Sequence, residues 1–320
     1  MNDSSPAPPS EGEVVTEPIQ PSGQSPLLDF FVGPHGIRAG WRFALYLAMW
    51  VATLFAFRFV LDGWQPRGKA LLWADLVGQI AALLSATVPA FVMARIENRK
   101  FDEYGLPLTK AFGTLFWVGA GWGIVAITIL MVAIRGLHGF YFGPLALHGV
   151  RILRFAIFWA VFFLLVGLFE EFFARGYAQF TLTGGVGFWP AALGLSIIFG
   201  AVHLNNSGEN WVGALGAGAI GLFFCFTLRR TGSLWFAVGM HASWDWGESF
   251  LYSVPDSGGM VTGHLLKSSL HGPIWLTGGT VGPEASVLLF VLVPLLWLLF
   301  NRVYPNVRYP VPEFRHPHGY

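Results

Sequence analysis

Long apolar runs constrain this chain more than any other feature of its sequence. A helix needs roughly 20 apolar residues to cross the hydrocarbon core of a membrane, and eight runs approach or reach that length. They are continuous, without the alternation of membrane β-strands. The sequence therefore predicts an all-α, polytopic membrane helix bundle of about eight transmembrane helices. The predicted spans are Trp41–Leu61, Ala70–Met93, Phe112–Ile134, Leu153–Gln179, Phe188–His203, Val212–Leu228, Leu234–Tyr252 and Ala285–Phe300.

The charge content fits lipid better than water as the solvent of this chain. Charged residues make up 12% of the sequence, about half of the roughly 25% that soluble domains carry. Thirty Phe and fourteen Trp add further apolar area. The net charge of +1 provides no basic field for a nucleic acid. We therefore expect a lipid bilayer as a partner, and no nucleic acid.

Composition divides the chain into four parts. Residues 1–37 are rich in Pro and Ser and are predicted to be a disordered tail. They lack the basic start and early apolar run of a signal peptide, so the first membrane helix is expected to act as the targeting signal. Residues 38–152 contain the first transmembrane helices, 153–252 the next four, and 253–320 a loop, the last helix and a C-terminal tail.

The distribution of Lys and Arg predicts the orientation in the membrane. If the N-terminus is inside, eleven basic residues lie on the cytoplasmic side and six on the other. Because cytoplasmic loops carry an excess of Lys and Arg, this count favours both termini inside. No organelle signal is visible, so a bacterial cytoplasmic membrane is the expected location.

Ionisable side chains inside the predicted spans indicate where the chemistry lies. Each costs about 2.5–3.5 kcal/mol on insertion scales, so its presence requires an explanation. Only two of the nine histidines fall in or at the end of a predicted span. The intruding residues are Glu170, Glu171 and Arg175 in the fourth span, His203 at the end of the fifth, and His241 and Asp245 in the seventh.

Helical spacing sorts these residues into groups. Glu171 and Arg175 are separated by four positions with the acid first, the favoured order for an ion pair on one helix face. Glu170 is turned about 100° away from that helix face, so it is less well placed to pair with Arg175 and is available for another interaction. His241 and Asp245 are also four positions apart, so both can point at one spot.

The fifth span requires a particular geometry if its polar end is to join the others. Phe199 lies one turn before His203 and is expected to wall the same pocket. At about 1.5 Å per residue, Glu170 lies roughly 20 Å and His203 roughly 30 Å from the turn between the fourth and fifth spans. A common site therefore requires the fifth helix to be tilted or broken.

The formal charges of the fourth and seventh spans do not balance. With neutral histidines, three carboxylates and one guanidinium sum to minus two. A buried cluster accommodates that charge by taking up protons or by binding a divalent cation. A carboxylate can act as general base toward water, whereas two histidines with carboxylates resemble a zinc shell with an open position. The candidate zinc ligands are Glu170, His203, His241 and Asp245.

At these residues the chain resembles the CPBP family of intramembrane proteases, which includes the CAAX prenyl endopeptidases and the bacterial Abi proteins. The family pattern is Glu-Glu-x-x-x-Arg, then Phe-x-x-x-His, then His-x-x-x-Asn or Asp, on successive membrane helices. Residues 153–252 are accordingly identified as a CPBP/Abi-like protease core, and 98–106 resembles the family's preceding link. The matching residues are Glu170, Glu171 and Arg175, then Phe199 and His203, then His241 and Asp245.

The resemblance implies hydrolysis of a peptide bond in a membrane-associated protein or peptide, with a prenylated substrate as one candidate. It assigns water activation to Glu170 and His203, and stabilisation of the oxyanion to His241 and Asp245. Both a metal-dependent mechanism and a metal-free glutamate base are open for the family. An ionised Asp accepts hydrogen bonds only and would repel an oxyanion. Asp245 is therefore expected to be protonated, to hold His241, or to bind metal.

Other interpretations of the same residues stay open at this stage. His203 near a helix end can be an interfacial residue bonded to Asn205 or Asn206, and the polar pairs can serve helix packing. Intramembrane carboxylates and histidines also occur in proton-coupled transporters, and a catalytically silent scaffold or immunity protein would use the fold alone. Glu209 and Glu248 lie near predicted span ends, where solvation is expected.

Overall fold

The computed structural model describes residues 30–33, 36–63 and 70–309, so residues 1–29 and 310–320 of the predicted tails lie outside the described part. The chain forms two units, residues 1–38 and 39–320. The described part of the first unit contains a two-stranded antiparallel sheet of β1 (Val32–Gly33) and β2 (Gly36–Ile37), within the range predicted as a tail.

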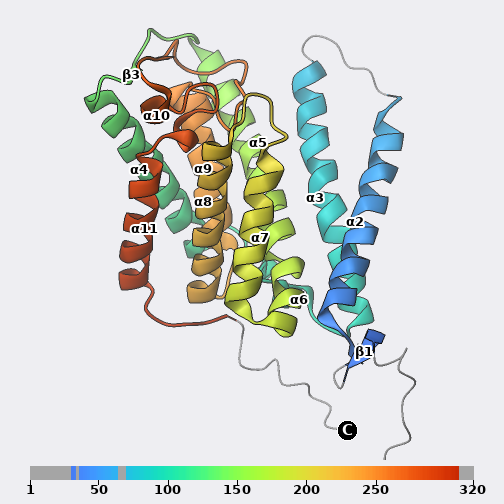
Figure 1. Cartoon of the computed structure of the whole chain (residues 1–320). Coiled ribbons are helices and arrows are strands. Elements are labelled where there is room, and N and C mark those ends of the chain that lie inside the picture. Colours follow the sequence, from blue (N-terminus) through green and yellow to red (C-terminus); the bar gives the residue numbers. More distant parts are fainter. Residues whose placement is uncertain (1–29, 34–35, 64–69, 310–320) are drawn as a thin grey trace, which may run out of the picture. The chain divides into compact units, whose positions relative to one another are not determined.

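The second unit is built almost entirely of helices (Figure 1). Two short strands, β3 (Phe140–Tyr141) and β4 (Ser269–Leu270), pair antiparallel and join the loops that follow α4 and α9. The all-α prediction is confirmed. The helices are α2 (Ala39–Leu61), α3 (Ala70–Ile96), α4 (Thr114–Gly136), α5 (Val150–Arg175), α6 (Tyr177–Val186), α7 (Phe188–His203), α8 (Trp211–Thr231), α9 (Trp235–Trp246), α10 (Ile274–Thr277) and α11 (Leu289–Val303).

Each predicted span contains a helix, but the helices differ in length. Five helical stretches are long and apolar enough to cross a membrane: α2, α3 from Leu72, α4, α5 continued through α6, and α8. The remaining three predicted spans contain α7 with 16 residues, α11 with 15 and α9 with 12. The chain is therefore an integral membrane protein, and five of its predicted spans meet the length requirement for crossing.

Exposed apolar side chains cover the outside of these helices. Only 6% of the apolar window of α2 is buried inside the protein, and Phe59 on that helix is 83% exposed. Val150 at the start of α5 is 80% exposed. Exposed apolar patches of this extent are not tolerated by a monomeric protein in water, which agrees with lipid as the surrounding medium.

Helix α9 packs closely between α4 and α5 because glycines remove the side chains at the contact. A Cβ on Gly119 of α4 would collide with the carbonyl oxygen of Phe236, and one on Gly239 of α9 with that of Phe116. Small residues at helix crossings let backbones in a membrane approach one another. The polar residues of α9 are thereby held at the centre of the bundle.

The predicted fourth span is longer than expected and is broken. The helix breaks at Gly176 between α5 and α6, and the turn to α7 lies at Gly187, where φ is 86°. Glu170 and His203 lie nearly the same number of residues on either side of Gly187, about 25 Å at 1.5 Å per residue. The expected mismatch in depth was therefore wrong, since it placed the turn too early, and α7 is helical from Phe188 to His203.

The predicted seventh span changes its winding part-way. Helix α9 ends at Trp246 and continues as a π-helix, η3 (Gly247–Tyr252). Beyond it the chain forms an irregular segment that carries β4, α10 and the 3-10 helix η4 (Pro283–Ala285) before α11 begins. Figure 1 shows β3 and α10 at the same end of the bundle. This segment forms part of the wall of the site described next.

Candidate active site

A cavity of about 550 Å³ opens between the helices and the segment that follows α9. Its wall combines residues of α5, α7, α8 and α9 with residues 256–262 and Glu284. The structure brings five of the sequence-predicted site residues to this one cavity. They are Glu170, Phe199, His203, His241 and Asp245.

Glu171 and Arg175 form a buried ion pair behind the cavity wall. Arg175 Nη1 donates to Glu171 Oε1 at 2.9 Å, and the two side chains are 1% and 0% exposed. The predicted pairing of these residues is confirmed. Because both charges are desolvated, removal of either would leave the other buried without compensation.

His241 is the link between this ion pair and the cavity. Its Nδ1 lies 2.8 Å from Glu171 Oε1, and an ionised carboxylate only accepts hydrogen bonds, so Nδ1 is the donor. Its Nε2 lies 3.4 Å from Asp245 Oδ2 and 3.8 Å from Glu170 Oε2. The ring also stacks on Phe224, with the ring centroids 5.7 Å apart. Glu171 thereby fixes which ring nitrogen faces the cavity carboxylates.

The neighbours Glu170 and Glu171 have different surroundings. Glu171 is fully buried against Arg175, whereas the side chain of Glu170 is 26% exposed and lines the cavity. The ion pairs of the described residues contain no contact between Glu170 and Arg175. Glu170 is therefore the carboxylate of the fourth span that is available to a molecule in the cavity.

Phe199 connects Arg175 to His203. The guanidinium carbon of Arg175 lies 4.2 Å from the centroid of the Phe199 ring, a cation–π contact. Nη2 of the same guanidinium has no hydrogen-bond partner among the described residues. The absent Cβ of Gly221 in α8 leaves the space that Nη2 occupies. The ring of Phe199 also lies 4.6 Å from that of His203.

His203 is oriented by the backbone of its own helix. Its Nδ1 lies 2.7 Å from the carbonyl oxygen of Phe199, which only accepts, so Nδ1 is again the donor. The alternative of a ring bonded to Asn205 or Asn206 is not what the structure contains. In the neutral ring Nε2 keeps its lone pair for the cavity that His203 lines.

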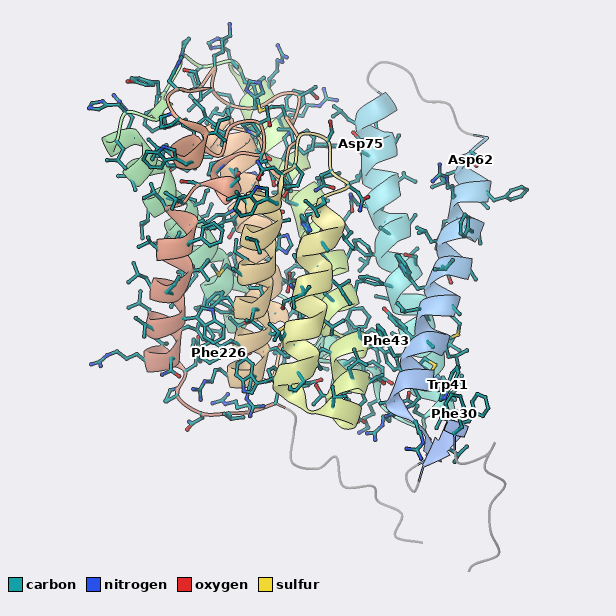
Figure 2. All side chains as sticks on the ribbon, in the orientation of Figure 1. Phe30, Trp41, Phe43, Asp62, Asp75 and Phe226 are labelled. Carbon is teal, nitrogen blue, oxygen red and sulfur yellow. The ribbon has the colours of Figure 1, made fainter. Side chains whose placement is uncertain are left out.

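The rest of the cavity wall is mainly apolar. Trp159, Phe162 and Phe163 of α5, the helix that carries Glu170, line it. Asp75 of α3 also lines it. Figure 2 places Asp75 near the start of α3, at the end of the bundle where Asp62 closes α2. The cavity therefore presents a long apolar surface beside a compact set of acids and histidines.

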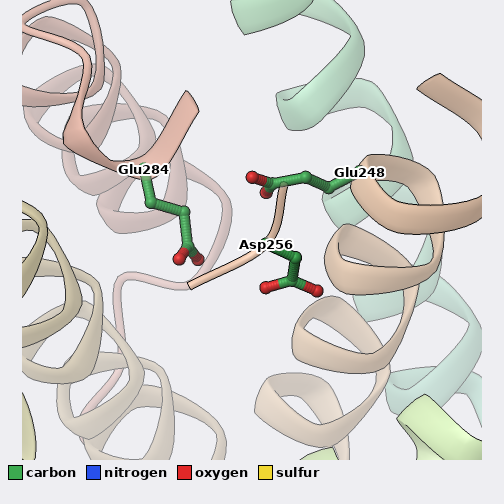
Figure 3. Close-up of side chains that lie close together, drawn as sticks. All are labelled: Glu248, Asp256 and Glu284. Carbon is green, nitrogen blue, oxygen red and sulfur yellow. The ribbon is translucent and has the colours of Figure 1, made fainter. Parts of the chain in front are cut away.

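Glu248, Asp256 and Glu284 form a second acidic cluster (Figure 3), and two of its members, Asp256 and Glu284, line the same cavity. One carboxylate oxygen from each lies within 4.8 Å of those of the other two. Glu248 is 0% exposed, so its expected solvation was wrong: the π-helix carries it inward. Burial, together with the charges of Asp245 and Glu284, raises the pKa of Asp256 well above its ordinary value.

The acidic cluster is the one group of three or more potential ligand atoms at this spacing among the described residues. The four predicted zinc ligands are not brought together as closely. Zinc in proteins is held mainly by His and Cys, and carboxylates alone suit harder ions. The structure therefore contains a candidate cation site, at a place different from the predicted one and without the donors typical of zinc.

Sequence reasoning missed the residues that belong to no motif. Asp256 and Glu284 lie in irregular segments, where no helical period indicates a neighbour. A local signal did exist for Glu248, because Trp244 precedes it by four residues and its indole N–H donates to Glu248 Oε2 at 2.8 Å. An acid placed one turn after a tryptophan in an apolar run can be buried by that bond.

Comparison with known proteins adds a family to this geometry. Residues 152–247 match the family described as type II CAAX prenyl endopeptidase Rce1-like. The matched range includes all three motifs on which the predicted resemblance rested, and the predicted kinship with CAAX-type intramembrane proteases is confirmed. Among curated proteins, none matches the chain.

Proposed function

We propose, from the match of its core to the Rce1-like family of type II CAAX prenyl endopeptidases, that this chain is an intramembrane endopeptidase that hydrolyses its substrate with water activated by Glu170 and His203. The observation that carries the proposal is the common cavity. Two histidines and two carboxylates from three helices line it, and an ion pair behind the wall holds one of those histidines.

Glu170 is the proposed general base. It is ionisable, lines the cavity and, among the described residues, forms an ion pair with His241 alone. In the reaction its carboxylate accepts a proton from water while the oxygen of that water attacks the carbonyl carbon of the scissile peptide bond. Nε2 of His203 accepts a hydrogen bond from the same water and orients it. The proton then passes from Glu170 to the departing amine, which balances the step.

His241 is the proposed stabiliser of the oxyanion. With Nδ1 donating to Glu171, the imidazolium form has Nε2–H available for the oxygen that becomes negative. Asp245 lies 3.4 Å from Nε2 and, as an acceptor, holds that ring in place before the substrate binds. Of the three roles left open for Asp245, holding His241 agrees best with this distance.

No step of this mechanism passes through a metal. The predicted zinc ligands are not gathered as closely as the carboxylates of the acidic cluster, which form the one such group among the described residues. The metal-free glutamate base therefore agrees better with the arrangement of the described residues than a zinc shell made by the same four groups.

The substrate is proposed to be a membrane-associated peptide, and a prenylated peptide is the first one to test. The wall formed by Trp159, Phe162 and Phe163 offers apolar surface on which an isoprenoid or another apolar chain can pack beside the reacting groups.

The predicted orientation, with both termini in the cytoplasm of a bacterial cell, is proposed from the excess of Lys and Arg on that side.

Substitution Glu170→Gln tests the proposed base. Glutamine keeps the shape and loses the ability to accept the proton, so cleavage of a prenylated peptide by the detergent-solubilised protein is expected to fall about 10²–10⁴-fold in kcat. The matched control is Glu209→Gln, the same change at an acid beyond the cavity wall, which is expected to cleave at the wild-type rate. Cleavage by Glu170→Gln at the wild-type rate would contradict the proposal.

A further inference from the structure

The acidic cluster has a charge that no described residue compensates through an ion pair. Adding Glu248, Asp256 and Glu284 to the three carboxylates and one guanidinium beside the cavity changes the formal sum from minus two to minus five. None of the ion pairs among the described residues includes any member of the cluster. Carboxylates this close and this buried need a compensating positive charge or protons.

Each carboxylate of the cluster is held by one neutral donor through one oxygen. Trp244 Nε1 donates to Glu248 Oε2 at 2.8 Å, Ser249 Oγ to Asp256 Oδ2 at 2.9 Å, and Ser257 Oγ to Glu284 Oε2 at 2.6 Å. The second oxygen of each takes part in none of the hydrogen bonds among the described residues. Outer-shell donors of this kind orient metal-ligating carboxylates.

Glu248 Oε1 is an independent indication that the cluster binds a ligand. The side chain is 0% exposed, and this oxygen has no hydrogen-bond partner in the described part of the chain. A buried, unsatisfied oxygen of a carboxylate costs free energy that native structures rarely tolerate. The carboxylate of Glu248 lies close to those of Asp256 and Glu284 (Figure 3), so a cation among the three would satisfy this oxygen.

The backbone around the cluster leaves room next to this oxygen. Gly282 has a φ of 108°, and a Cβ there would lie 2.9 Å from Glu248 Oε1 and would collide with the carbonyl oxygen of Pro255. A Cβ on Gly216 of α8 would collide with the carbonyl oxygen of Glu284. Two glycines thus allow three separate segments to bring their carboxylates to one point.

We propose that Glu248, Asp256 and Glu284 bind a hard divalent cation of the size of calcium. Oxygens on opposite sides of a calcium ion lie about 4.6–5.2 Å apart, from Ca–O distances of about 2.3–2.6 Å. The separation of at most 4.8 Å among the three oxygens therefore suits one ion. Donors that are all carboxylates are typical of calcium sites.

The ion ties the segment after α9 to the helix bundle. It joins the π-helix through Glu248, the loop at Asp256 and the turn of η4 at Glu284. Residues of that segment line the cavity, and Glu248 lies less than one helical turn from Asp245. The inference concerns the stability of this wall and goes beyond the proposed proteolysis, so its test needs no substrate.

Calcium binding to the detergent-purified full chain is the test. After treatment with a chelator and dialysis, calcium chloride is titrated while heat of binding and thermal unfolding are measured. One calcium ion per chain is expected, with a rise in the unfolding midpoint that sodium chloride of equal ionic strength does not produce. Absence of both effects at millimolar calcium would overturn the proposal.

Charge-neutralising variants locate the ion. Glu248→Gln and Glu284→Gln are each expected to weaken calcium binding at least tenfold, whereas Glu209→Gln, the same change at a nearby acid outside the cluster, is expected to bind as the wild type does. If Glu248→Gln does not fold, the half-buried Glu284 supplies the result. Wild-type affinity in Glu284→Gln, or an equal loss in Glu209→Gln, would place the ion elsewhere and overturn the assignment.

Discussion

Two acidic groups lie at one cavity, and they differ in how their charge is balanced. Glu171 lies between Arg175 of its own helix, α5, and His241 of α9. Glu248, Asp256 and Glu284 lie at a helix end and in irregular segments, and the ion pairs of the described residues contain none of them. In the first group the chain supplies its own cation, whereas in the second the described residues supply neutral hydrogen-bond donors and no cation.

Because of this difference, buried carboxylates in the two groups have opposite effects on the stability of the fold. In the paired group each charge stabilises the folded state through its partner, so deleting one charge is harmful. In the unpaired group each charge repels the others, so deleting one relieves the fold when no cation is bound. The sign of the stability change therefore distinguishes the two, and the following experiments rely on that sign.

The largest effect on stability is expected for Arg175→Met. Methionine fills much of the space but leaves the fully buried Glu171 with only His241 as a partner. Loss of one member of a buried ion pair typically costs about 3–5 kcal/mol, and the free energy of unfolding in detergent, measured with a chemical denaturant, should fall by that amount.

The double variant Glu171→Gln with Arg175→Met is the control for this experiment. Because it removes both charges, it is expected to lose less stability than Arg175→Met alone, a non-additive result that marks direct coupling. Additive losses would mean that the two residues act separately and would remove the paired group from the comparison.

A smaller effect on stability is expected when the acidic cluster is ionised by a rise in pH. In this cluster the negative charge lowers stability, whereas in the paired group it raises stability. The pKa of Asp256 is raised in the folded protein by burial and by Asp245 and Glu284, with His241 acting against them. As pH rises above the ordinary pKa of Asp, about 3.9, the unfolded chain releases its proton first, so stability falls until the raised pKa is passed. Glu248, the third acid of the cluster, also lies close to Asp256.

Calcium should cancel this loss, because the ion replaces the proton on the carboxylates. The rise in the unfolding midpoint caused by calcium is therefore expected to be larger at pH 8 than at pH 5. The variant Asp256→Asn should show a smaller dependence on pH both in chelator and in calcium. A rise in midpoint that is the same at both pH values would contradict competition between calcium and protons.

The smallest effect is expected for Ser257→Ala. The hydroxyl of Ser257 holds one oxygen of Glu284 at 2.6 Å, and it is a second contact, not a ligand. Loss of such an orienting group lowers metal affinity by about tenfold, which calorimetry resolves, while thermal stability in chelator should hardly change. An unchanged calcium affinity would show that Glu284 needs no orientation from Ser257.

The paired group could be predicted from the sequence because its spacing is local. Glu171 with Arg175 and His241 with Asp245 are each four residues apart on a helix, and the structure contains both contacts. The bond between Glu171 and His241 joins helices 70 residues apart, and no period in the sequence indicates it. The motifs identified the residues, but only the fold shows their partners.

The acidic cluster and the depth of His203 could not be predicted from the sequence. Asp256 and Glu284 meet through irregular backbone, whose path depends on close glycine contacts instead of on a repeating pattern. The depth was misjudged because α6 contains Gln179, which suggested a span end. Gln179 is 0% exposed and donates to the carbonyl oxygen of Phe188, so a polar residue there is satisfied within the membrane.

The two histidines of the cavity use the same ring nitrogen for their own support. Nδ1 of His203 is bound to a backbone carbonyl and Nδ1 of His241 to a carboxylate. Replacement by Asn places an amide near Nδ1, whereas replacement by Gln places it near Nε2. At both positions Asn is therefore expected to keep the hydrogen bond made by Nδ1 and to lose Nε2, whereas Gln is expected to keep a polar group near Nε2 and to lose the bond of Nδ1. Comparing the two substitutions at each histidine separates the effect of its supporting hydrogen bond from the effect of the nitrogen that faces the cavity.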